Sequence, residues 1–155
     1  MVNTSNLFPV ALSDIEITVE TNVFMEPSAS FNLKIKGTGE VEFTPSGYSL
    51  IEPSPSSIEP ELVKDIIAAA LEIGFFEMKS DYTEESILEV TPEGSIEQGM
   101  GCILDGEATT FTIRLGSHKK SIYAHWGYPK RLDWFYRLVL DVTGVSEIIE
   151  EWVED

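Results

Sequence analysis

The sequence predicts an α+β fold, a two-layer domain in which a mainly antiparallel sheet of about five strands carries two or three helices on one face. Alternating apolar and polar residues, typical of half-buried strands, occur as two hairpins, and helical spacing occurs in separate blocks after each hairpin. The resulting order is strand-strand-strand-helix-strand-strand-helix-helix, whereas a parallel doubly wound sheet needs strands and helices that alternate throughout. The chain has 155 residues, of which 43% are hydrophobic, so we expect a single domain over 1–155. We expect flexibility in 1–13 and in part of 79–105.

The first three strands are predicted by period-2 alternation. Apolar residues alternate with polar ones in 14–22, 31–36 and 40–44, and Gly37 and Gly39 mark the turn of a hairpin between the last two ranges. Charge pairing across the outer face of this hairpin is expected from Lys34, Lys36, Glu40 and Glu42.

The first helix follows a segment expected to be a loop. Residues 45–57 contain three prolines and five serines, and a helix is predicted to start near Ser57 with Pro60 in its first turn. Gly74 is placed to end it. The apolar face at helical spacing is formed by Ile58, Leu62, Ile66, Ala69 and Ile73. Residues 75–78 are expected to be extended and buried, and the acidic range 79–101 has little pattern.

The second half repeats the hairpin-then-helix arrangement. Residues 110–115 and 122–126 alternate around a turn at Gly116 and Ser117, and Gly127 and Pro129 then open a helix. This helix is predicted to end at about Thr143, before Gly144, and to bury Leu132, Phe135, Val139 and Val142. A last short helix is expected to use Ser146 as its cap and to bury Ile148, Ile149 and Trp152. At the centre of the interior we expect Ile66, Ile73, Phe135 and Val139.

Most of the chain resembles a known family in its patterned hydrophobic residues and turn glycines. The segments that carry the resemblance are 30–43, 73–78, 81–82, 112–115, 122–126 and 132–145. Together they are similar to domain-of-unknown-function family 6438, small bacterial proteins, often secreted or membrane-anchored, with no assigned activity. Members commonly carry Cys-x-Gly-x-Cys-Pro before the second strand, but 23–29 contains no cysteine here, so no thiol-pair chemistry is expected. The resemblance therefore implies a fold and no function.

The charge balance narrows the classes of function. The chain has 27 Asp and Glu residues against 10 Lys and Arg residues, a formal net charge of −17. So acidic a chain is not expected to bind nucleic acid or an anionic membrane surface. Cys102 is the single cysteine, which excludes an internal disulfide and a cysteine-built zinc site. With neither a secretion signal nor an 18-residue apolar run in the sequence, we expect a cytoplasmic protein.

Catalytic, cofactor and metal signatures are not found in the sequence. It contains no Gly-x-Ser-x-Gly, no phosphate-binding glycine loop and no His-Glu-x-x-His, so we expect neither an enzyme nor a cofactor. A nucleophilic pair of Cys102 with His118 or His125 is far less expected than an inert thiol. His118 is expected to be exposed in a turn, and His125 to be structural. The acids Asp81, Glu84, Glu85 and Glu89 match no calcium-loop spacing, and no metal site is expected.

Two functions remain open from the sequence. The favoured one is a non-enzymatic, acidic interaction domain that binds a basic partner protein. The alternative is a small-ligand or anion-binding domain, or a weakly specified enzyme, that uses the second hairpin and the helix near Pro129. Its candidate residues are Tyr82, Arg114, Tyr123, His125, Tyr128, Lys130 and Arg131.

The range 114–137 contains six basic residues and one acidic residue, Asp133, in an otherwise acidic chain. These bases either form an anion site with the helix N-terminus or, as we favour, pair with carboxylates of the same chain. A third interpretation is that the negative charge serves solubility alone. The sequence predicts no oligomeric state.

Overall fold

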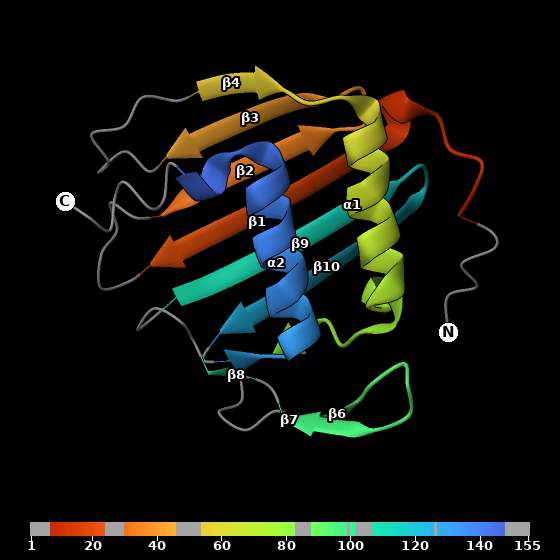
Figure 1. Cartoon of the computed structure of the whole chain (residues 1–155), viewed down its shortest axis with the longest axis vertical. Coiled ribbons are helices and arrows are strands. Elements are labelled where there is room, and N and C mark those ends of the chain that lie inside the picture. The colour runs from red at the N-terminus through yellow and green to blue at the C-terminus, as the bar shows by residue number, and fades with distance from the viewer. Residues whose placement is uncertain are drawn as a thin grey trace.

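A seven-stranded sheet forms one layer of the protein, and two helices form the other (Figure 1). The computed structural model describes residues 7–23, 30–45, 54–82, 88–98, 100–101, 107–125 and 127–147. In chain order the elements are η2 (Leu12–Asp14), β1 (Ile15–Val23), β2 (Phe31–Lys36), β3 (Glu40–Pro45), β4 (Ser54–Ser57), α1 (Pro60–Glu72), η4 (Phe75–Glu77), β5 (Asp81–Tyr82), β6 (Leu88–Val90), β7 (Ile96–Gln98), β8 (Met100–Gly101), β9 (Glu107–Leu115), β10 (His118–His125), β11 (Gly127–Tyr128) and α2 (Lys130–Thr143). Both α1 and α2 lie on the same face of the sheet, which confirms the α+β class.

The sheet differs in detail from the expected five antiparallel strands. Its order is β4-β3-β2-β1-β9-β10-β5, and β5 pairs parallel with β10, so the sheet is mixed. The two unexpected strands are short and lie at the two edges. β4 falls inside 45–57, which was expected to be a loop, and its Pro55 is compatible with an edge position because an edge strand leaves part of its backbone unpaired. β5 pairs through Asp81 and Tyr82 with β10, and the Ser80 carbonyl just before β5 accepts a hydrogen bond from the Tyr123 N–H at 2.9 Å.

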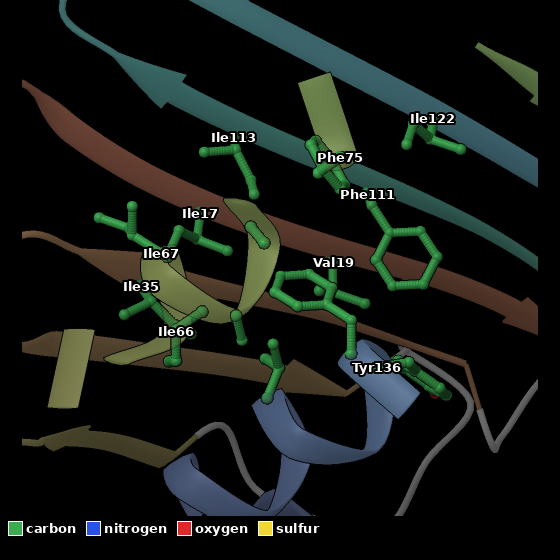
Figure 2. Packing of buried hydrophobic residues seen from close by; sticks show 14 of the residues in the cluster. Ile17, Val19, Ile35, Ile66, Ile67, Phe75, Phe111, Ile113, Ile122 and Tyr136 are labelled. Atoms are coloured by element: carbon green, nitrogen blue, oxygen red, sulfur yellow. The ribbon is translucent and has the colours of Figure 1, made fainter. Parts of the chain in front are cut away.

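The inner face of the sheet and the two helices enclose one hydrophobic core. The predicted alternation is observed: Ile17 opposes Ile35 on β2 and Ile113 on β9, and all three are buried. Figure 2 shows these strand residues facing α1 and α2. The four residues expected at the centre are buried, with exposed fractions of 0% for Ile66, Phe135 and Val139 and 5% for Ile73.

Helix α1 begins later than predicted, and its buried stripe differs from the predicted one at the first turns. Ser57 still belongs to β4, so the helix starts at Pro60, with Glu59 as its N-cap residue. Leu62, expected in the core, is 37% exposed, and Val63 and Ile67 are buried instead. The full set of buried residues in this helix is Val63, Ile66, Ile67, Ala69 and Ala70.

Gly74 ends α1 as predicted and redirects the chain into a turn. It adopts φ 73°, a left-handed conformation that favours glycine. The next residues form the 3₁₀ turn η4 rather than the extended segment expected, since the Glu77 N–H bonds to the Gly74 carbonyl at 3.0 Å. Phe75, Phe76 and Met78 are buried, so the expectation of burial is confirmed.

Helix α2 follows the second hairpin, whose turn at 116–117 is confirmed. It covers Lys130–Thr143 and ends at Gly144, which has φ 80°. Tyr136 and Leu140 are buried, whereas Val142, expected in the core, is only half-buried. Residues 145–147 are helical again. The predicted burial of Ile148, Ile149 and Trp152 lies outside the described residues, as does most of 23–29.

The poorly patterned range 79–101 contributes two small pairings besides β5. β6 and β7 form an antiparallel hairpin with Val90 opposite Ile96, and β8 pairs with β11. Figure 1 shows β6 and β7 beyond the end of α1 and the start of α2. This placement brings together the end of α1, the β6–β7 hairpin and the start of α2, which are distant in sequence.

Candidate functional site

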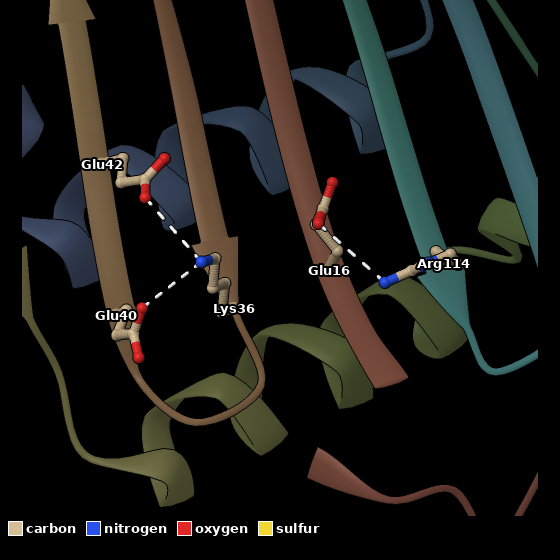
Figure 3. Close-up of polar contacts among 5 residues, drawn as sticks. All are labelled: Glu16, Lys36, Glu40, Glu42 and Arg114. Atoms are coloured by element: carbon tan, nitrogen blue, oxygen red, sulfur yellow. Dashed lines mark ion pairs between the residues drawn. The ribbon is translucent and has the colours of Figure 1, made fainter. Parts of the chain in front are cut away.

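The structure divides the predicted site residues between two faces of the protein. Lys130 and Arg131 occupy the first turn of α2. Arg114 lies instead on the face of the sheet that carries no helix, with its Nη2 atom 4.0 Å from Glu16 Oε2 (Figure 3). Tyr123 alternates between the buried Ile122 and Ala124, which places it on that same open face.

Three other candidates do not join a common site. Tyr82 is buried, and its hydroxyl accepts a hydrogen bond from the Lys79 N–H at 3.1 Å. The backbones of His125 and Tyr128 lie in β10 and β11, but their side chains are outside the described residues, as is Cys102. His118 is exposed, as predicted, but it is the first residue of β10 rather than part of the turn.

Lys130 and Arg131 line a cleft of about 330 Å³, which we call the helix-end cleft. Its walls come from the end of α1, the β6–β7 hairpin and the start of α2. The lining residues are Glu72, Ile73, Thr91, Pro92, Glu93, Glu97, Lys130, Arg131 and Trp134. Three acids and one exposed aromatic residue thus surround the two predicted bases.

The β6–β7 turn is built by hydrogen bonds around Thr91. The Thr91 N–H bonds to the Ser95 carbonyl at 2.8 Å, and the Ser95 N–H bonds to Thr91 Oγ1 at 3.2 Å. Gly94 completes the turn with φ 89°, in a conformation that a side chain would strain. The turn places Pro92 and Glu93 at the wall of the helix-end cleft.

Arg131 of α2 contacts the C-terminal end of α1 beside the helix-end cleft. Its Nη1 atom donates a hydrogen bond to the Ile73 carbonyl, next to the C-terminal end of α1. A cation is favoured there because the last carbonyls of a helix carry partial negative charge. Gly74 leaves room for the guanidinium, since a Cβ at this position would lie 3.2 Å from Arg131 Nη1 and 3.6 Å from Glu77 Oε2. Glu77 is therefore a fourth acid close to the cleft.

Lys130 faces a carboxylate across the cleft. Its Nζ atom lies 4.0 Å from Glu97 Oε1, and the two side chains are 61% and 34% exposed. Such a solvated pair contributes little to stability. It nevertheless places one of the three lining acids beside a positive charge.

Other bases also contact groups of the same chain. Lys36 lies 3.4 Å from Glu40 and 3.9 Å from Glu42 on the open face (Figure 3). On α1, the hydrogen bond from Lys64 to Glu61 raises the pKa of the Lys64 amino group above its usual value. Lys120 donates hydrogen bonds to the Met78 carbonyl and, at 3.2 Å, to Ser80 Oγ.

Asp133, next to the cleft residues in sequence, is a buried carboxylate that pairs with the exposed side chain of Arg137. Its Oδ2 atom accepts a hydrogen bond from Arg137 Nε at 2.9 Å. Its Oδ1 atom is buried and has no hydrogen-bond partner among the described atoms. With Arg114 beside Glu16 and Lys130 beside Glu97, three of the six bases in 114–137 meet carboxylates among the described residues, as the favoured interpretation expects.

Sequence reasoning singled out Lys130 and Arg131 but missed the acids and Trp134. Glu72, Glu93 and Glu97 are ordinary members of an acidic sequence, and only the fold gathers them. Trp134 did carry a signal, because it lies off the helical stripe that buries Leu132, Phe135 and Val139. A tryptophan off that stripe is expected to be exposed, and Trp134 is 46% exposed.

No protein-family model matches this chain, and no curated protein shows significant sequence similarity to it. Within the described residues, no helix combines the length and apolar character that crossing a membrane requires. No group of three or more His, Cys, Asp or Glu side chains in the same ranges is arranged to hold a metal ion.

Proposed function

We propose that this chain is a non-enzymatic interaction domain that binds a basic partner protein through its acidic surface. The observation that supports the proposal is a difference between its bases and its acids: most bases contact groups of the same chain, whereas many acids do not. Of the ten basic residues, seven contact carboxylates or backbone carbonyls of the same chain: Lys36, Lys64, Arg114, Lys120, Lys130, Arg131 and Arg137.

Many acids, in contrast, remain open to solvent. In the described ranges, the following exposed acids form no ion pair with a base placed there: Asp14, Glu20, Glu59, Glu72, Glu77, Asp81, Glu93, Asp141 and Glu147. They occur in both halves of the chain and at both ends of α1. The resulting negative field attracts a basic protein over long range and accelerates their encounter.

The test begins with capture of partners from the native lysate at low salt and continues with the purified partner. We expect a basic protein whose association constant, measured by calorimetry, decreases with salt and is largely lost by about 0.5 M, because salt screens exposed charges. The absence of any partner at any salt concentration would count against the proposal. So would a reconstituted complex of equal affinity at low and high salt.

The alternative, an anion-binding domain, is supported by one feature. Lys130 and Arg131 line the helix-end cleft at the N-terminus of α2, where backbone N–H groups carry partial positive charge. Three glutamates line the same cleft and oppose an anion there. Phosphate titration followed by amide chemical shifts tests this alternative, and unmoved amides in 128–133 would contradict it.

A further inference from the structure

We infer that the helix-end cleft receives an arginine or lysine side chain from an exposed segment of the partner. This inference rests on the proposed function and specifies where the contact is centred. The expected ligand is a cation because both bases of the cleft contact groups of this chain, whereas two of its carboxylates and its tryptophan are exposed.

Three acids and two bases line the cleft, and two of the acids are open to a ligand. Glu72 and Glu93 line the cleft, are exposed, and pair with none of the described bases. Glu97 lies beside Lys130, and Arg131 donates to the Ile73 carbonyl. An incoming guanidinium or ammonium group therefore meets carboxylates whose charge is not already neutralised.

The C-terminal end of α1 adds to this preference. Ile73, whose carbonyl accepts a hydrogen bond from Arg131, lines the cleft together with Glu72. Partial negative charge on the last carbonyls of a helix favours cations. Glu77 lies close to the same point, beside Gly74.

Trp134 provides a surface for the cationic group. Its neighbours Asp133 and Phe135 are buried, whereas Trp134 is 46% exposed and lines the cleft. Indole faces attract guanidinium and ammonium groups, and the attraction increases when water is excluded between them. Tryptophan is also enriched among the residues that dominate binding energy in interfaces.

The β6–β7 hairpin offers an apolar contact next to this site. Val90 and Ile96 lie opposite one another in the hairpin and are 69% and 72% exposed. Adjacent exposed aliphatic side chains are typical of protein contact surfaces. Since the same hairpin supplies Pro92 and Glu93 to the cleft, a partner segment that inserts a basic side chain can also cover this pair.

Removing the charge of Lys130 distinguishes a cationic ligand from an anionic one, because it changes the two affinities in opposite directions. A bound cation competes with Lys130 for Glu97 and is repelled by its charge, so removing that charge strengthens cation binding. A bound anion is attracted by Lys130, so the same change weakens anion binding. Lys130→Gln therefore separates the two kinds of ligand.

The direct experiment is a ¹H–¹⁵N NMR titration of the full chain with acetyl-arginine amide at constant ionic strength. Acetyl-citrulline amide, which has nearly the same shape without the charge, is the matched control ligand, and inorganic phosphate is the anionic probe. We expect acetyl-arginine amide to shift the Trp134 indole N–H and the amides of Gly74, Glu93 and Arg131. We expect acetyl-citrulline amide to shift them far less.

Variants then assign the effect to individual charges. Glu72→Gln and Glu93→Gln are each expected to weaken acetyl-arginine amide binding about three- to fivefold, and Lys130→Gln to strengthen it about twofold or more. Glu20→Gln makes the same charge change on the open sheet face and is expected to leave the affinity unchanged. Unchanged amide spectra away from the cleft verify that each variant is folded.

The outcomes distinguish this inference from the proposed function. If Lys130→Gln weakens binding, or if only phosphate shifts the cleft amides, the cationic assignment is wrong. If a basic partner binds with salt sensitivity but is indifferent to Glu72→Gln and Glu93→Gln, the interaction function stands and the cleft is not its centre. If acetyl-arginine amide binds the cleft while no basic protein is found at any salt, the cation site stands and the interaction function fails.

Discussion

Phe135 lies in the middle of the layer between the sheet and α2, so replacing it with alanine tests the packing that holds the two layers together. Its side chain is 0% exposed, and its ring centroid lies 5.8 Å from that of Phe75 and 6.3 Å from that of Phe111. Removing a fully buried phenylalanine side chain costs about 3–5 kcal/mol, because apolar surface is lost and the cavity closes only partly. That is a large fraction of the roughly 5–15 kcal/mol that stabilises a typical domain.

Urea unfolding followed by far-UV circular dichroism measures this cost, because the helices and the sheet contribute directly to the signal. We expect Phe135→Ala to lower the thermal midpoint by roughly 6–20 °C as well, given the size of the chain. The matched control is Trp134→Ala, which removes an aromatic side chain from the next position of the same helix but from its exposed side. This packing is contradicted if the free energy of unfolding of Phe135→Ala lies within about 1 kcal/mol of that of the unmodified protein, or if Trp134→Ala lowers it as much.

Two further predictions concern stability. Gly39→Ala is expected to destabilise the fold by about 1–3 kcal/mol, because φ is 104° and the added Cβ would lie 2.1 Å from the Ile58 carbonyl oxygen. The control is Gly94→Ala, where φ is 89° and an added Cβ would have nothing within 4 Å, so we expect a smaller loss of stability in the same urea assay. Equal losses for the two variants would contradict the predicted clash. Arg137→Ala is expected to cost about 1–3 kcal/mol, because it removes the hydrogen bond to the buried Asp133 carboxylate. The double variant with Asp133→Leu should recover part of that loss, and a double variant less stable than Arg137→Ala would contradict this explanation.

Local alternation and spacing were sufficient to predict the central strands and the helix ends. In β2, Leu33 and Ile35 are buried on the same side, as the period-2 pattern requires. Gly74 and Gly144 mark the ends of α1 and α2 because each adopts a positive φ that other residues avoid. These features depend on residues close together in sequence, which is why the sequence alone reveals them.

The features that the sequence missed depend on tertiary contacts. β4 contains only serine and proline, so no apolar pattern marks it, and its identity comes from pairing with β3. β5 is two residues long and is defined by its parallel pairing with β10. The error at Leu62 arose because Leu62 shares helical spacing with Ile66 and Ile73, whereas the helix buries Val63 instead.

The candidate site was also predictable only in its local part. Lys130 and Arg131 were noticeable as bases at the start of a helix in an acidic chain, and they do lie together. Arg114 and Tyr123 were grouped with them from sequence, but alternation along β9 and β10 directs both to the opposite face of the sheet. The glutamates of the cleft come from α1 and the β6–β7 hairpin, and no local pattern connects those segments with α2.

The most direct test of the central claim, that this acidic surface recognises a basic protein, is the salt dependence of the reconstituted complex. Calorimetry of the purified partner with the full chain, from about 0.1 M to 1 M NaCl, spans screening lengths from about 10 Å to about 3 Å. We expect the association constant to decrease steadily over this range, by about tenfold or more, because recognition depends on exposed charges. An association constant that stays the same across the range would show that the acidic surface does not carry the interaction.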